Sequence, residues 1–145
     1  MTNRSKAKGT AAESAVARVM RANGWPDAER SALHGAKDRG DLTGIGQVCV
    51  EVKGGHAAEQ ASDGQVLAWM AELDAECVHK GADVGVLVMK RKGVGHANAE
   101  RWWAVMWLQD TSVDPRGGQV RGIPVRMTLA DACRVLRALG YGVAS

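Results

Sequence analysis

The chain has 145 residues, of which 46% are hydrophobic and 24% charged, with a formal net charge of +3 at pH 7. This is typical of one globular domain, residues 1–145, long enough to bury roughly two-thirds of the surface exposed by its unfolded chain. No apolar run approaches the ~20 residues that span a bilayer, and the opening MTNRSKAKGT lacks the apolar core of a signal peptide. The three cysteines are far apart and form no CxxC pair. We therefore expect a cytoplasmic protein with no membrane partner.

The first elements predicted along the chain are a helix and a short strand. Apolar side chains recur at helical spacing over residues 10–23, and Gly24 ends the pattern. Residues 1–9 before this helix are expected to form a flexible basic tail. A strand near residues 29–33 then leads into a polar loop that contains glycine, HGAKDRG.

The later elements alternate between strands and helices. Ser62 or Asp63 starts a helix that runs to Lys80, and Thr128 caps a last helix that ends at Gly140. Four strands are expected: residues 47–53, the continuously apolar Val84–Met89, the tryptophan-rich Arg101–Leu108 and, at the sheet edge because Pro124 cannot donate to a ladder, Ile123–Met127. This order predicts an α/β fold with one mixed sheet flanked by helices.

Positive charge is concentrated in two segments. Residues 1–40 hold eight Lys or Arg against four Asp or Glu, and KRK opens the glycine-containing loop KRKGVGHAN. Such patches often neutralise phosphates, although a solvated basic surface would have the same composition. The candidate contacts to nucleic acid are Lys6, Lys8, Arg30, His34, Lys37, Arg39, Lys90, Arg91 and Lys92.

The strand VCVEVK carries an unusual polar face. With a period of two, Glu51 and Lys53 point to one face of the sheet, roughly 6–7 Å apart along the strand. If residues 44–46 form a three-residue hairpin turn, Thr43 pairs with Gln47, and Asp41 stands opposite Cys49 on the face of Glu51. A register shifted by one residue would instead send Asp41 to the other face.

Two carboxylates with a backbone carbonyl between them suit a hard cation. Asp41, Glu51 and the carbonyl of Val52 would offer oxygen ligands to Mg²⁺, which lowers the pKa of a bound water and stabilises charge on a phosphate. Lys53 would orient that water or offset phosphate charge. The alternative is a cross-strand salt bridge on a solvated face, worth about 0–1 kcal/mol.

Several motifs occur together in one order along residues 6–92. They are KGTAAESAVARVMRANGW with Glu13, a polar loop before Asp41, VCVEVKGG with Glu51 and Lys53, then Gln65, and last the apolar strand VGVLVMKRK. In this order and spacing the chain resembles the PD-(D/E)xK nuclease superfamily, and within it the Holliday junction resolvases of archaeal and phage type. Two departures are a glycine in place of proline before Asp41, and Asp38 as a rival for the metal position.

The resemblance implies a restriction-endonuclease-like three-layer fold and a Mg²⁺-dependent endodeoxyribonuclease in which Mn²⁺ substitutes. The residues that match the family motifs are Asp41, Glu51 and Val52 as metal ligands, Glu13 as an assisting ligand and Lys53 as the water-positioning group. The substrate implied is a four-way DNA junction in a bacterial or phage-infected cell, cut by a homodimer. The alternatives are cleavage of flaps, single strands or restriction-type sites, a nuclease that needs partner proteins, and a catalytically silent DNA-binding module.

Two of these residues, Glu13 and Gln65, have a competing structural explanation. Glu13 follows Thr10 by three residues, as in a capping box, and lies about 20° from Met20 at the edge of the apolar stripe. Gln65 follows Ser62 at the same spacing, so it is either a cap or an accessory catalytic residue. The strand at residues 102–108 likewise either enters the core or forms part of a dimer interface.

Overall fold

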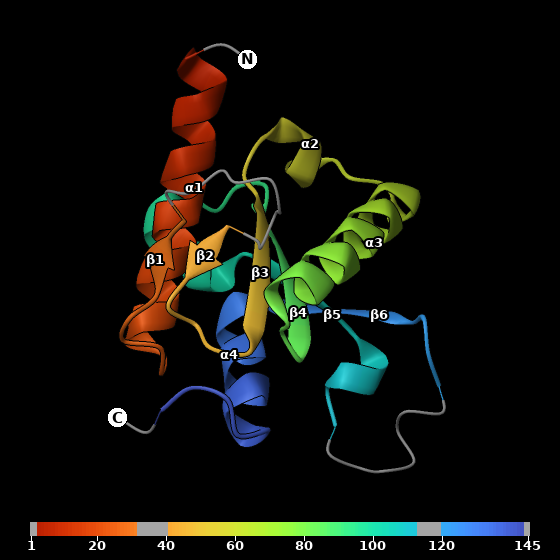
Figure 1. Ribbon diagram of the computed structural model, residues 1–145. Helices are drawn as coiled ribbons and strands as arrows, with labels where there is room; N and C mark the ends of the chain where they lie inside the picture. The colour runs from red at the N-terminus through yellow and green to blue at the C-terminus, as the bar shows by residue number, and fades with distance from the viewer. Residues whose placement is uncertain (1–2, 32–40, 113–119, 144–145) are drawn as a thin grey trace.

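The computed structural model describes residues 3–31, 41–112 and 120–143 and shows a mixed α/β architecture (Figure 1). A four-stranded sheet with the order β3-β4-β5-β6 lies between helices on both of its faces. In the described parts of the chain, no helix combines the length and the apolar character needed to cross a membrane.

The sheet joins one parallel and two antiparallel pairs. β3 (Val48–Lys53) runs parallel to β4 (Val84–Met89), which is antiparallel to β5 (Trp103–Trp107). β6 (Pro124–Thr128) pairs with β5 and closes one edge of the sheet, as Pro124 predicted. Parallel strands need a long crossover, and α2 (His56–Glu59) and α3 (Asp63–Lys80) supply it between β3 and β4.

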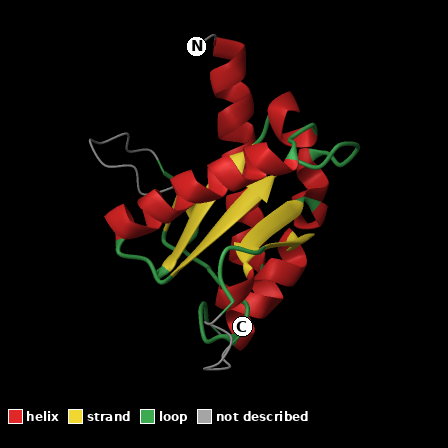
Figure 2. Cartoon of the chain, turned by 90° about the vertical axis from the view of Figure 1, so that its right-hand side faces the viewer, coloured by secondary structure: helices red, strands yellow, loops and turns green. Residues whose placement is uncertain are grey.

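The two faces of the sheet have separate apolar cores. On one face, side chains of α1 (Asn3–Ala22) and α4 (Leu129–Ala138) pack on the valines of β3 and β4. On the other face, α3 packs on the sheet through Trp69, Met70 and Leu73 (Figure 2). Short 3₁₀ turns at His96–Arg101 and Leu108–Asp110 flank β5. β5 is an interior strand, Trp102 is fully buried next to it, and Trp103 and Trp107 are partly buried against the core on the α3 face.

The structure confirms the predicted limits of α3 and the cap of α4. The Ser62 hydroxyl accepts from the backbone N–H of Gln65 at 3.1 Å, and Gly81 ends α3 in the left-handed conformation with φ 73°. The Thr128 hydroxyl accepts from the N–H of Asp131 at 3.2 Å. Both short polar side chains therefore satisfy amides that no carbonyl of their own helix can reach.

The predicted start of the first helix is wrong. α1 begins at Asn3, so residues 3–9 are helical rather than a flexible tail, and Thr10 lies inside the helix. Glu13 is then a mid-helix residue and no capping box exists at this position. The first turns of α1 extend beyond the sheet in Figure 1.

The turn before β3 also differs from the expected hairpin. β2 (Leu42–Thr43) pairs with β1 (Glu29–Arg30), so Thr43 lies opposite Glu29 instead of Gln47. Gly44 has φ 76° and lies so close to Asp27 that an added Cβ would be 2.0 Å from its carbonyl oxygen. This close approach fastens the loop before β3 to the segment that follows α1.

Replacing Gly44 with alanine is therefore expected to lower the free energy of unfolding by more than the roughly 1–2 kcal/mol that a left-handed backbone costs an L-residue. Gly46 is a matched control, because it has φ 63° with nothing within 4 Å of an added Cβ. Thermal unfolding of Gly44→Ala and Gly46→Ala compares the two. Equal destabilisation would contradict the close approach to Asp27.

Candidate active site

Glu51 and Lys53 project from β3 towards α3, on one face as predicted. The Lys53 Nζ lies 3.4 Å from the Glu51 Oε1, 3.8 Å from the Glu72 Oε2 and 5.4 Å from the centre of the Trp69 ring. Glu51 is only 8% exposed. The pair is therefore covered by α3 and is not a salt bridge on a solvated face.

One oxygen of the Glu51 carboxylate lacks a donor. Within the described residues, the Glu51 Oε2 is buried and has no hydrogen-bond partner. A buried acceptor without a partner costs about 1–3 kcal/mol, and more when the group is charged. A cation bound beside this oxygen would remove that cost.

Asp41 is held at the free edge of β3. Its N–H donates to the Val50 carbonyl at 2.8 Å, its Oδ2 accepts from the Val52 N–H at 2.7 Å, and its carbonyl accepts from the Ser31 N–H at 2.8 Å. The predicted pairing of Asp41 with Cys49 is therefore wrong by one residue, and the expectation that Asp41 shares the face of Glu51 no longer follows from the register. The carboxylate lies at the edge of the strand beside Val52, because β2 pairs with β1 and the predicted hairpin does not form.

The Val52 carbonyl points to the same edge. Backbone groups of successive strand residues point to opposite sides, and in β3 the Lys53 carbonyl accepts from the Lys90 N–H on the side of β4 at 2.9 Å. The Val50 carbonyl points the other way, to Asp41. Val52 shares the direction of Val50, so its carbonyl and the Asp41 carboxylate lie along one edge of β3.

Glu13 is engaged elsewhere. Its Oε2 lies 3.9 Å from the Arg30 Nη1, which joins α1 to β1. Both side chains are partly exposed, at 21% and 34%. Over residues 3–31, 41–112 and 120–143, no three His, Cys, Asp or Glu side chains are placed together to hold a metal. The structure thus brings Asp41, Val52, Glu51 and Lys53 to one strand, whereas Glu13 is paired with a predicted DNA contact.

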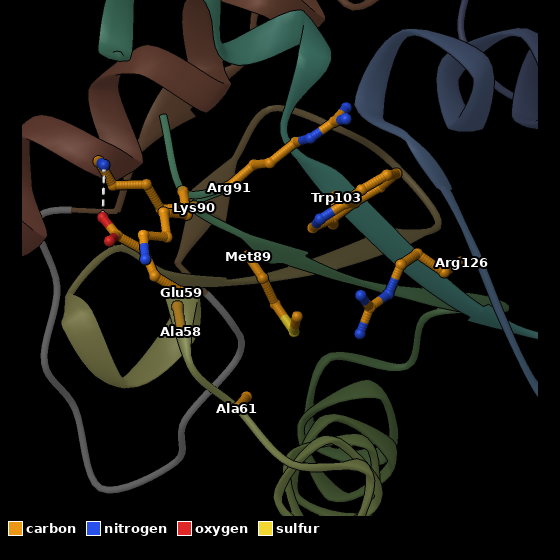
Figure 3. A pocket seen from close by; sticks show the side chains of 9 residues that line it. Ala58, Glu59, Ala61, Met89, Lys90, Arg91, Trp103 and Arg126 are labelled. Atoms are coloured by element: carbon orange, nitrogen blue, oxygen red, sulfur yellow. Dashed lines mark hydrogen bonds and ion pairs between the residues drawn. The ribbon is translucent and has the colours of Figure 1, made fainter. Parts of the chain in front are cut away.

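The three basic residues after β4 have different surroundings (Figure 3). The Lys90 Nζ donates to the Glu59 Oε1 at 2.7 Å, and this hydrogen bond holds the pKa of the Glu59 carboxyl below its ordinary value. The guanidinium of Arg91 lies 4.0 Å from the centre of the Trp103 ring, and Lys92 is exposed. Lys90 is therefore neutralised by Glu59, so Arg91 and Lys92 are the better candidates for contacts to phosphate.

The structure does not place the other residues predicted to contact DNA, or Gln65, in the candidate active site. His34, Lys37 and Arg39, like the rival Asp38, lie outside the described residues, as do the side chains of Lys6 and Lys8. Gln65 has an exposed side chain at the start of α3, where its N–H meets Ser62. This contact uses the backbone of Gln65 and makes Ser62 the cap, so it does not distinguish a capping from an accessory role for the Gln65 side chain.

Arg126 and Glu59 were missed from the sequence, and Trp103 was noticed only as part of an apolar strand. Their positions beside Arg91 depend on sheet register and on the short helix α2, which no local pattern predicted. No protein-family model, curated protein or solved structure matches the chain, so its own side chains carry the functional inference.

Proposed function

We propose that the chain is a metal-dependent DNA endonuclease that hydrolyses phosphodiester bonds with Mg²⁺, for which Mn²⁺ substitutes. The observation that carries the proposal is the buried Glu51 carboxylate, whose Oε2 has no donor in the described residues while Lys53 stands 3.4 Å from its Oε1. Asp41 and the Val52 carbonyl add oxygens at the adjacent edge of β3.

These oxygens fit a hard divalent cation. Mg²⁺ is bound in proteins through one or two carboxylates and keeps several waters, so it needs no cage of protein ligands. Asp41, Glu51 and Val52 would hold it, and Glu13 would assist only if its contact with Arg30 opens. When bound, the ion supplies a water of lowered pKa and stabilises negative charge on the phosphate.

The chain's own residues supply orientation. The Val52 N–H fixes the Asp41 carboxylate through its 2.7 Å hydrogen bond, and burial under α3 restricts Glu51. Lys53 is partly exposed, so its ammonium can face both Glu51 and an incoming phosphate. A fixed cation beside the scissile phosphate stabilises the charge that develops in the transition state.

We extend the proposal to a restriction-endonuclease-like fold, which the mixed sheet with helices on both faces allows. The resemblance of the sequence favours a four-way junction as substrate, and a homodimer would match the two strands to be cut. A flap or single-strand nuclease is the second candidate. The observation that favours it is a basic pocket around Trp103, on the same face of the sheet as Glu51.

Purified protein incubated with labelled four-way junction, flap, duplex and single strand tests the proposal. We expect cleavage with Mg²⁺ or Mn²⁺ and none in EDTA. The DNA that is cleaved fastest identifies the preferred substrate structure. Binding without cleavage of all four DNAs, in either metal, would instead indicate a silent DNA-binding module. Neither binding nor cleavage would overturn the proposal altogether.

A further inference from the structure

A pocket of about 250 Å³ opens where β4 ends, between α2 and the neighbouring strands (Figure 3). Its lining combines two kinds of surface. Met89, Ala58 and Ala61 are apolar, and Lys90, Arg91, Lys92 and Arg126 are basic. At the low end of the volumes of ligand sites, the pocket has room for one small unit and not for a duplex.

Trp103 stands between the two arginines of this pocket. The Arg91 guanidinium is 4.0 Å from the ring centre, and the Arg126 guanidinium is 5.5 Å from it. Arg126 is exposed on the edge strand β6, so its side chain can move away from the ring. A flat aromatic group could then stack between Trp103 and Arg126, as bases do on tryptophan and guanidinium planes.

The charge of the pocket indicates that the ligand also carries an anionic group. Among the described residues that line the pocket, Glu59 is the one acidic residue, and it is paired with Lys90 at 2.7 Å. Three cations, Arg91, Lys92 and Arg126, therefore remain for an anion. Guanidinium groups bind phosphate with two parallel hydrogen bonds, whereas a simple anion would make no use of the Trp103 ring. A nucleotide has both the flat ring and the phosphate.

The pocket shares a face of the sheet with the candidate active site. The register places Lys53 beside Met89 and Met89 beside Trp103. Trp103 is thus two strands from Lys53, about 10 Å at 4.7–4.9 Å per strand. One DNA strand can pass over this distance from the pocket to the carboxylates of β3.

We infer that this pocket holds one unpaired nucleotide of the substrate, with its base against Trp103 and its phosphate on Arg91, Lys92 and Arg126. The inference rests on the proposed nuclease function and favours its second candidate substrate, a flap or a single strand, over the four-way junction. A base inside a duplex is stacked on its neighbours and cannot offer its face to a side chain. The pocket therefore selects DNA with an unpaired strand, such as a flap or a single strand.

Binding in EDTA tests the inference apart from cleavage. A labelled eight-nucleotide single strand and a blunt duplex of equal length are titrated with the parent and two variants, with fluorescence anisotropy as the readout. Trp103→Leu should weaken single-strand binding roughly 5- to 150-fold and leave duplex binding unchanged. Arg126→Gln should lower the slope of log K against log salt on the single strand by about 0.7.

Arg134→Gln is the matched control, because Arg134 is 83% exposed on α4, the helix on the opposite face of the sheet. It should leave both affinities unchanged. Arg126 is exposed, so its variant keeps the fold and decides the outcome if Trp103→Leu unfolds.

Four results would overturn the inference. Equal losses on single strand and duplex would mean a general basic surface. Inorganic phosphate that displaces the single strand equally well from the parent and from Trp103→Leu would mean an anion site without base recognition. Full single-strand binding by both variants would show that the pocket does not bind the nucleotide, and it would leave the nuclease proposal unaffected. A parent protein that binds no DNA would contradict both the inference and the nuclease proposal.

Discussion

Glu51→Gln is expected to abolish DNA cleavage in Mg²⁺ while DNA binding persists. The substitution keeps the shape of the side chain but removes the negative charge of a carboxylate that is 8% exposed and has one oxygen without a donor in the described residues. With a ligand lost, a metal and its water would be misplaced, and misplacement by about 1 Å can cost 10²-fold in rate. Asp41→Asn should have the same effect. Single-turnover cleavage measures the rate, and electrophoretic mobility measures binding.

Glu76→Gln is the matched control, because Glu76 is also buried, at 6% exposure, but lies on α3 near Cys49 and is not one of the proposed ligands. It should retain cleavage. A second readout needs no activity: Mg²⁺ should raise the unfolding temperature of the parent and of Glu76→Gln, since a ligand of the folded state stabilises it, but not that of Glu51→Gln. Undiminished cleavage by Glu51→Gln would end the nuclease proposal.

Local patterns were enough to predict the strands and most helices. β4 is apolar over six residues and is buried throughout, as its sequence predicts, whereas β3 alternates in sequence and is nevertheless buried on both faces. The helices α3 and α4 each start at a hydroxyl side chain that caps the first amides, Ser62 and Thr128. These signals act within one turn or one strand, so a single sequence contains them.

Contacts between residues that are distant in the chain could not be predicted from the sequence. The motif TAAE has the spacing of a capping box, yet α1 continues back through Gly9 to Asn3. Asp41 missed its expected partner because β2 pairs with β1, and Arg30 is held by Glu13 on α1. Each contact joins segments that are far apart in the chain.

The same limit applies to the positive charge. Lys90, Arg91 and Lys92 are equivalent in sequence, but only the fold separates a lysine neutralised by Glu59 from an arginine stacked on Trp103. Counting basic residues therefore overestimates the surface free for phosphate. Which of these basic residues forms an internal ion pair and which faces the pocket depends on the register of the sheet and on the position of α2.

Lys53→Ala is expected to lower the cleavage rate by about 10²–10³-fold, the scale of losing one preorganised group that stabilises charge in the transition state. The ammonium is 27% exposed and has Glu51, Glu72 and the Trp69 ring around it, so it is oriented but accessible to a phosphate. DNA binding should change little, because Lys53 is only one of many cations that contribute to the affinity. Mg²⁺ should still raise the unfolding temperature of Lys53→Ala, since the oxygens of Asp41, Glu51 and Val52 remain.

Glu72→Gln separates the chemistry of Lys53 from its ion pairs. Glu72 is 61% exposed, and an exposed pair of this kind is worth about 0–1 kcal/mol, so the variant should cleave at a rate close to the parent's. A lysine needed only to neutralise Glu51 would give a different pattern: Lys53→Ala would be less stable in EDTA, and Mg²⁺ would restore both its stability and its full rate. Full activity of Lys53→Ala in Mg²⁺ would therefore assign the lysine to the fold, and a rate loss that Mg²⁺ cannot restore assigns it to the reaction.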